Sequence, residues 1–228
     1  MSLESKKTNQ IRTEEFKVKY LSKEVLDIGA GPDPVVSGCT VFDVEDGDAN
    51  NINSYFKKET FDTVYSSHCL EHMHNARSCL KQWWGLVKPG GYMVTVVPHE
   101  DLYEQHIWPS VFNEDHKWTF RAAGKTSWSP VSINIVEETE QLDNAVVLNI
   151  ETHDNNYDYE LVFPLGKTPK NRHGFWNRQA TSLAKRLPKN LGKAIIRHQV
   201  NRGYPYPQTL KSGALAQIQI VAQKHMPS

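Results

Sequence analysis

The sequence lacks the features that mark disulfide-bonded, secreted or membrane-spanning proteins. Its three cysteines, Cys39, Cys69 and Cys79, form no CxxC pair, which argues against a disulfide framework and a cysteine-based zinc site. No apolar run approaches the roughly 20 residues that cross a bilayer, and the first residues are polar. We therefore expect a cytoplasmic protein with reduced thiols, folded as a single domain over residues 1–228.

The chain also lacks net charge, with 26 basic and 26 acidic residues, but these charges are unevenly spread. Residues 161–208 contain ten Lys or Arg and no acid, so we expect a basic insert on an acidic body. Apolar residues between the cations, including Phe175 and Trp176, predict one or two short amphipathic helices that break at Pro188.

Three kinds of ligand fit such a basic insert. They are an anionic membrane surface contacted peripherally, a phosphate-bearing or lipid-linked acceptor, and nucleic acid. Nucleic acid is disfavoured, because the acidic body would repel its phosphates. The structural alternative is a solvated helix face that pairs with the acidic body or with a second subunit. The sequence does not determine the oligomeric state.

Short β-branched runs alternate with helical stretches, which is typical of an α/β fold with a doubly wound, mostly parallel sheet. The expected strands are 23–28, 40–42, 61–66, 92–97, 145–152 and 214–223, and the expected helices are 8–20, 75–87 and 131–140. Residues 88–91, Lys-Pro-Gly-Gly, should form a turn. Residues 98–130 are too long for a plain connection, so we expect them to form a substrate loop.

The first expected strand ends in Gly29-Ala30-Gly31, a turn in which small residues expose the backbone to a ligand. Asp43 ends the second strand, the position from which a carboxylate binds ribose hydroxyls in such sheets. Only 15 residues separate Asp27 from Asp43, and two prolines follow Gly31, so the first crossover helix should be shortened or absent. A third glycine is missing, which disfavours a dinucleotide cofactor and hence an NAD-dependent oxidoreductase.

Four segments occur in an order that resembles the class I S-adenosylmethionine-dependent methyltransferases of the type 11 kind. They are residues 25–31 (VLDIGAG), 42–49 (FDVEDGDA), 61–72 (FDTVYSSHCLEH) and 86–91 (LVKPGG). The resemblance implies a seven-stranded Rossmann-like sheet, S-adenosyl-L-methionine as cofactor, and methyl transfer as the activity. It further implies cofactor contacts from Asp27, Gly29 and Gly31 at the methionine end, Asp43 at the ribose, Asp48 and Ala49 at the adenine, and Ser66 and His68 beside the sulfonium. The alternative for Asp43 and Asp48 is a purely structural role in turns.

Methyl transfer to a hydroxyl also needs a group that removes the proton. The substrate loop offers two histidines, whose unperturbed pKa lies near neutrality, and two neighbouring acids as orienting or alternative bases. These candidate catalytic residues are His99, His116, Asp101 and Asp115. The expected reaction is O-methylation of a small-molecule or sugar acceptor. The alternatives are that these residues only satisfy loop backbone groups, and that the chain is a non-catalytic nucleoside-binding regulatory or partner subunit.

A metal site is the alternative at the end of the third expected strand. His68 and His72 are four residues apart, with Glu71 and His74 adjacent, a spacing that suits zinc on one face of a helix. The segment lies at a strand-to-helix junction, however, and the family resemblance explains it without a metal. The expected site therefore contains no metal.

Overall fold

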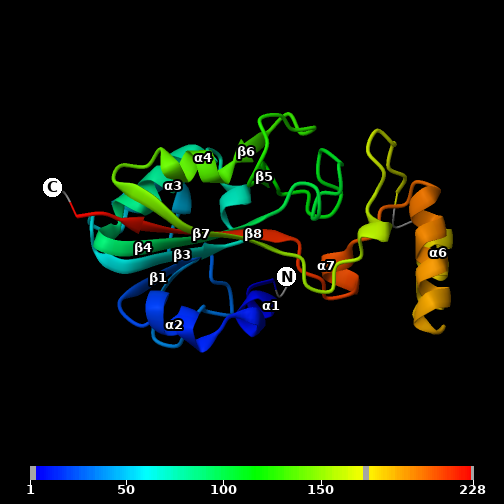
Figure 1. Cartoon of the computed structure of the whole chain (residues 1–228), viewed down its shortest axis with the longest axis horizontal. Coiled ribbons are helices and arrows are strands. Elements are labelled where there is room, and N and C mark those ends of the chain that lie inside the picture. The colour runs from blue at the N-terminus through cyan, green and yellow to red at the C-terminus, as the bar shows by residue number, and fades with distance from the viewer. Residues whose placement is uncertain (1–3, 172–174, 227–228) are drawn as a thin grey trace.

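The computed structural model of the chain describes residues 4–171 and 175–226 (Figure 1). A mixed sheet lies at the centre, with helices on both faces (Figure 1). The strand order is β2-β1-β3-β4-β8-β7, and β8 runs antiparallel to both of its neighbours. Its strands are β1 (Val25–Ile28), β2 (Thr40–Phe42), β3 (Phe61–Ser67), β4 (Val87–Pro98), β7 (Ala145–His153) and β8 (Gln217–Lys224).

The predicted doubly wound α/β fold is confirmed, with six strands in the main sheet of the described residues where seven were expected. Between β2 and β3 the chain forms a 3₁₀ helix, η1 (Ala49–Ser54), and no strand. This segment is rich in Asn, whose side chains bond to nearby backbone groups and favour caps and turns over sheet pairing. A separate two-stranded sheet pairs β5 (Thr119–Arg121) with β6 (Ser132–Asn134).

The strands read as continuous apolar runs because both faces of the sheet are covered. One face packs Leu26 and Val64 against Trp83 of α3 (Ala76–Gly85). The other face packs Val25 and Tyr65 beneath the N-terminal helices. Those helices are α1 (Glu4–Ile11) and α2 (Glu14–Tyr20), so the expected helix over residues 8–20 is divided in two. The division falls at Thr13, whose side chain accepts a hydrogen bond from the Phe16 N–H and caps α2.

Two further local expectations were changed by strand pairing. Residues 88–91 lie inside β4 as an irregularity, where the partner register jumps from Phe61–Val87 to Thr63–Tyr92. The expected helix over 131–140 starts only at Ile135, as α4 (Ile135–Glu140), because the preceding residues pair with β5. The expected shortening of the first crossover is confirmed, since residues 29–39 form turns and no helix.

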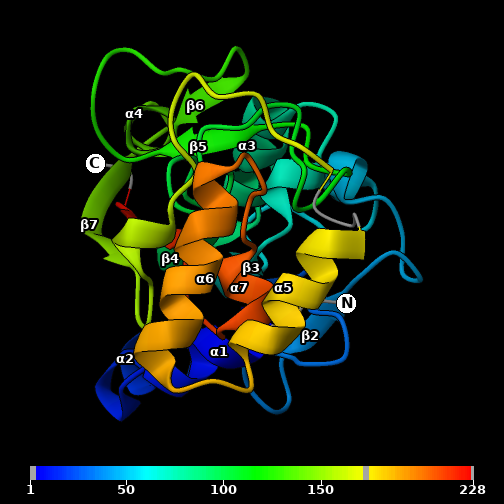
Figure 2. The same cartoon turned by 90° about the vertical axis from the view of Figure 1, so that its right-hand side faces the viewer.

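The basic insert forms a helical cap beyond the carboxyl ends of the parallel strands (Figure 1). It contains α5 (Phe175–Ala184) and α6 (Lys189–Asn201), with η3 (Tyr159–Leu161) before them and α7 (Gln208–Lys211) completing the cap after them. Figure 2 shows α5 and α6 packed side by side. Pro188 caps α6 at the predicted break. Arg172 and the side chains of Phe175 and Trp176 lie outside the described residues.

A second apolar cluster joins the cap to the loop of residues 98–130. Leu102, Tyr103 and Phe112 from the loop pack with Val200 of α6 and with Tyr206. The loop and the cap are therefore built as one layer over the end of the sheet. Among the described residues, no helix combines the length and the apolar character needed to cross a bilayer.

Candidate active site

A cavity of about 720 Å³ lies at the carboxyl ends of β1, β2 and β3. This volume is in the range of small-molecule sites, and the position is where parallel α/β sheets bind their ligands. Its walls come from α1, the turn after β1, the ends of β2 and β3, η2 (Leu70–His72) and the loop of residues 98–130. The lining includes Glu4, Ser5, Gly29, Gly31, Asp43, Ser67, His68, Glu71, His72, Tyr103, Asp115 and His116.

The glycine turn forms one wall of this cavity. Gly29 has φ +75°, and an added Cβ would lie 2.8 Å from the Cβ and Sγ of Cys69, so both backbone and packing require glycine. Gly31 has φ +57° and faces open space, with no protein atom within 4 Å of an added Cβ. The backbone at Gly31 is therefore accessible to a ligand.

Asp43 ties this turn to the end of β2. Its Oδ2 accepts a hydrogen bond from the Gly31 N–H at 2.6 Å, and its Oδ1 accepts one from the Val44 N–H at 2.7 Å. Asp43, Gly29 and Gly31 all line the cavity, as the sequence predicts for cofactor contacts. The structure thus brings these three residues together.

Asp27 lies beside the cavity and does not line it. Its buried Oδ2 accepts a hydrogen bond from the Val35 N–H at 2.7 Å, which holds the loop that replaces the first crossover helix. Burial raises the pKa of Asp27 to about 7, although the Val35 N–H and the Arg12 charge oppose the shift. From this position Asp27 stabilises the glycine turn without lining the cavity.

The expected adenine contacts also lie outside the cavity lining. Asp48 caps η1, where its Oδ1 accepts hydrogen bonds from the backbone N–H of Asn50 at 2.9 Å and from the Asn50 side chain at 2.8 Å. These bonds lower the pKa of Asp48. The Ala49 carbonyl accepts a hydrogen bond from Trp83 Nε1 at 3.1 Å. Both residues therefore have local structural roles.

The end of β3 supplies His68 to the cavity. Its backbone has φ +53°, a left-handed conformation, and its Nε2 lies 2.9 Å from Gln217 Oε1. Burial opposes protonation of this ring, but the neighbouring Glu71 outweighs it and the pKa of His68 is raised. Ser66 is buried behind the wall, and the adjacent Ser67 lines the cavity instead.

The four candidate catalytic residues divide into two pairs. His116 and Asp115 line the cavity. The buried His116 places Nδ1 2.6 Å from Glu104 Oε1, and Asp115 places Oδ2 2.9 Å from His72 Nδ1. The structure therefore brings His116 and Asp115 together with the glycine turn in one cavity.

His99 and Asp101 do not line the cavity, and the contacts of their side chains lie within the loop. His99 Nδ1 accepts a hydrogen bond from the Asp101 N–H at 3.1 Å, and burial lowers the pKa of His99. Asp101 Oδ1 accepts a hydrogen bond from Trp128 Nε1 at 2.8 Å and lies 3.3 Å from His106 Nε2. This pair organises the loop.

Sequence reasoning assigned no catalytic role to three groups beside His116. Glu71 is fully buried at the cavity wall, Glu104 bonds to the His116 ring, and Tyr103 lies with its ring centroid 5.1 Å from that of His116. The segments after β3 and β4 are rich in acids and histidines, and this was the only indication in the sequence. It did not distinguish these three residues from their neighbours.

Comparison with known proteins identifies the class of this fold and cavity. The model of a methyltransferase domain family matches residues 7–128, more than half of the chain, so the protein belongs to that family. It is therefore a methyltransferase. No curated protein matches the chain.

Solved structures share the fold at low sequence identity. A chain from the complex of the Haloferax volcanii Trm112 methyltransferase activator with its methyltransferase is 13% identical, with a TM-score of 0.51 over 99% of this chain and 90% of that chain. A SAM-dependent methyltransferase from Archaeoglobus fulgidus is 16% identical, with a TM-score of 0.48 over 96% of this chain and 94% of that chain.

The cavity suits S-adenosylmethionine. The space in front of the Gly31 backbone is open and can hold part of a ligand. The Asp43 carboxylate lies beside Gly31 and bonds to its N–H. The carboxylates of Asp43, Glu71 and Asp115 at the walls favour a ligand that carries a positive charge. A sulfonium cofactor without phosphates satisfies these conditions.

Proposed function

We propose that this methyltransferase methylates a hydroxyl group of a small-molecule or sugar acceptor, beside His116. S-adenosylmethionine supplies an electrophilic methyl group, so the protein has to position the acceptor and promote loss of its proton. The observation that carries the proposal is the contact of His116 Nδ1 with Glu104 at 2.6 Å. A carboxylate on Nδ1 orients the ring and leaves Nε2 for chemistry.

The proposed cofactor contacts keep Gly29 and Gly31 at the methionine end and Asp43 at the ribose. Asp27 then acts through the Val35 N–H by holding the turn, and His68 stands near the sulfonium. Asp48 and Ala49 remain the proposed adenine contacts, which requires the adenine to extend from the cavity towards the start of η1.

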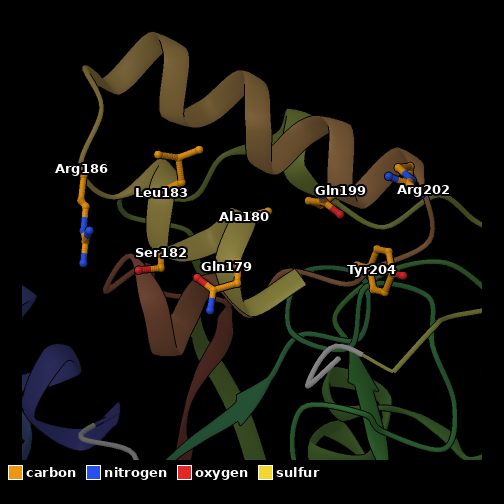
Figure 3. A pocket seen from close by; sticks show the side chains of 8 residues that line it. All are labelled: Gln179, Ala180, Ser182, Leu183, Arg186, Gln199, Arg202 and Tyr204. Carbon is orange, nitrogen blue, oxygen red and sulfur yellow. The ribbon is translucent and has the colours of Figure 1, made fainter. Parts of the chain in front are cut away.

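The proposed acceptor carries a phosphate, because the cap offers unpaired cations. The cap helices frame a hollow of about 710 Å³, whose lining includes Arg186 and Arg202 (Figure 3). A neighbouring hollow is lined by Arg178, Lys185 and Lys211. None of these five cations forms an ion pair with a described residue.

Other cations of the cap are already neutralised. Lys193 pairs with Asp158 at 2.8 Å and with Glu160 at 2.6 Å, and Arg197 also pairs with Glu160. Ion pairs with acids of the same chain therefore account for the cations on this side of α6, and no ligand is needed to explain them. The hollow between α5 and α6 is the side with free positive charge, and it supports an anionic part of the acceptor.

Transfer of a labelled methyl group to a set of hydroxyl acceptors, with and without phosphate, tests this function. His116→Ala should lower kcat by roughly 10²-fold while calorimetric affinity for S-adenosylhomocysteine stays unchanged. His99→Ala should keep the wild-type rate, because that side chain faces the loop. Methylation only at nitrogen or carbon, or an unchanged rate in His116→Ala, would overturn the proposal.

A further inference from the structure

We propose that Glu71, His72 and His116 bind a divalent transition-metal ion, Zn²⁺ by the chemistry of the donors, at the wall of the cofactor cavity. The role given to this metal, activation of the acceptor hydroxyl, rests on the proposed function. The metal site itself rests on the arrangement of these three side chains.

The first observation is a buried carboxylate with no hydrogen bond of ordinary geometry, whose nearest possible donor is the His68 ring. Glu71 is 0% exposed, and neither of its carboxylate oxygens has a hydrogen-bond partner among the described residues. Its Oε1 is instead surrounded by ring nitrogens: His68 Nδ1 at 3.4 Å, His72 Nε2 at 3.8 Å and His116 Nε2 at 3.9 Å. The long contact with His68 compensates a carboxylate removed from water only in part, and a bound cation would compensate it fully.

The second observation is the orientation of the two rings. His116 Nδ1 lies 2.6 Å from Glu104 Oε1, and His72 Nδ1 lies 2.9 Å from Asp115 Oδ2. An ionised carboxylate only accepts, so each Nδ1 carries the proton and each Nε2 presents its lone pair to Glu71. Histidines that bind metals in proteins are held by carboxylates in this way.

The distances agree with a metal site. One donor atom from each of Glu71, His72 and His116 lies within 4.8 Å of the others. Bonds of 2.0–2.1 Å in a tetrahedral site separate donors by roughly 3.4 Å, so each pair of donors needs to close by at most about 1.4 Å. The Lys117 N–H donates to the Glu71 carbonyl at 2.8 Å, which fixes the segment that carries His116 against η2.

The donor set selects the kind of ion. Two imidazoles and one carboxylate suit zinc and its neighbours in the transition series, whereas Mg²⁺ and Ca²⁺ prefer oxygen ligands throughout. Three protein ligands leave a coordination position open, as catalytic zinc sites require. His72 and His116 line the cavity, so that position faces the space next to the cofactor.

The helical spacing considered in the sequence does not form this site. Leu70–His72 is a single 3₁₀ turn, and His68 precedes it with φ +53°, so His68 and His72 do not share a helix face. His74 is exposed, and its N–H bonds to Asn50. The third ligand comes instead from His116, far along the chain, which local sequence spacing does not reveal.

The metal would take part in methyl transfer as follows. The acceptor hydroxyl oxygen would occupy the open position, and its O–H bond would break as the proton passes to solvent water at the cavity mouth. The oxygen then forms a bond to the methyl carbon while the carbon–sulfur bond breaks. The electron pair of that bond stays on sulfur, giving neutral S-adenosylhomocysteine, and the reaction consumes no oxidant or reductant.

Metal binding can be measured without any acceptor. The metal-free protein is titrated with Zn²⁺ by calorimetry and with Co²⁺ by visible absorption, and about one equivalent should bind with a d–d spectrum of nitrogen and oxygen ligands. Glu71→Gln, His72→Ala and His116→Ala should each weaken binding at least tenfold, and Glu104→Gln should weaken it about tenfold. His74→Ala, an adjacent exposed histidine, is the matched control and should bind as the wild type does.

Several outcomes would overturn the metal site. The first is that the wild type binds less than about a tenth of an equivalent of Zn²⁺ or Co²⁺. The second is that the three ligand variants bind the metal as well as His74→Ala does. The third is that His74→Ala loses metal binding as the ligand variants do. His72→Ala keeps the test valid if Glu71→Gln fails to fold, because the His72 side chain is partly exposed. If the wild type binds no Zn²⁺ or Co²⁺ while His116→Ala still loses turnover, the metal fails and His116 acts as the base itself.

Discussion

At the scale of single residues, Asp43 gives the most direct test of cofactor binding. Replacing it by Ala removes the carboxylate that accepts from the Gly31 N–H and faces the proposed ribose. We expect the affinity for S-adenosylmethionine to fall at least tenfold in calorimetry, because a charge-assisted pair of hydrogen bonds to the ribose is lost. Glu45→Ala, an exposed acid in the same segment, should bind normally, and an unchanged affinity in Asp43→Ala would refute the assignment.

Asp27 should make stability depend on pH. Its pKa is raised from 3.8 in the unfolded chain to about 7 in the fold, so the folded state holds the proton between these values. Protein stability therefore falls as pH rises from about 4 to 7, by roughly 2–5 kcal/mol from this group. Urea unfolding at pH 5 and pH 8 should show a smaller decrease for Asp27→Asn than for the wild type. Equal decreases would mean that Asp27 ionises normally in the fold.

The same two aspartates show what the residue pattern reveals. A strand-end acid and a glycine turn are local features, and the residues that this pattern singled out, Asp43, Gly29 and Gly31, line the cavity. It did not reveal that the Asp27 carboxylate bonds to Val35, nor that His116 lines the cavity and His99 does not. Side-chain direction depends on tertiary contacts that spacing does not encode.

At the scale of elements, the cap provides the test of the acceptor. The double variant Lys185→Gln/Arg186→Gln removes free positive charge beside the hollows of α5 and α6. We expect KM for a phosphate-bearing acceptor to rise about tenfold with little change in kcat, and the effect to shrink as salt is added. Lys193→Gln changes a cation that is already paired, and it should alter KM much less. Equal effects of the two changes would argue against an anion site in the hollows.

Element boundaries followed the sequence where local preference and pairing agree. Thr40–Phe42 is a strand at the expected residues because its β-branched run pairs with β1. Residues 131–140 were misjudged because Ser132–Asn134 pairs with β5, and such a partner is not visible in the run itself. The break of the cap at Pro188 was predictable, since proline alone accounts for it.

At the scale of the whole molecule, α1 connects the two ends of the chain around the cavity. Glu4 and Ser5 line the cavity, and Lys7 Nζ donates to the carbonyls of Thr209 and Ala214 at 3.1 and 2.9 Å. Thr8 donates to Gln217, the residue that contacts His68. The N-terminal helix therefore closes the cofactor cavity from a distant part of the sequence.

Removal of residues 1–11 should open that cavity. We expect cofactor affinity to fall about tenfold, mainly through faster dissociation in stopped-flow measurements, while far-UV circular dichroism keeps the signal of the sheet and remaining helices. Removal of residues 1–3 alone is the matched control and should change neither quantity. Full affinity after removal of residues 1–11 would mean that α1 does not retain the cofactor.

The missing first crossover helix, together with the acidic cavity walls, has a consequence for turnover. No helix N-terminus follows β1 to offer partial positive charge, while Asp43 and Asp115 stand at the walls. The reaction converts a cationic sulfonium into a neutral thioether, so the attraction between these carboxylates and the cofactor ends at the moment of transfer. Such a cavity would bind S-adenosylmethionine more tightly than S-adenosylhomocysteine because only the former carries the sulfonium charge. We therefore expect weak inhibition of this enzyme by S-adenosylhomocysteine.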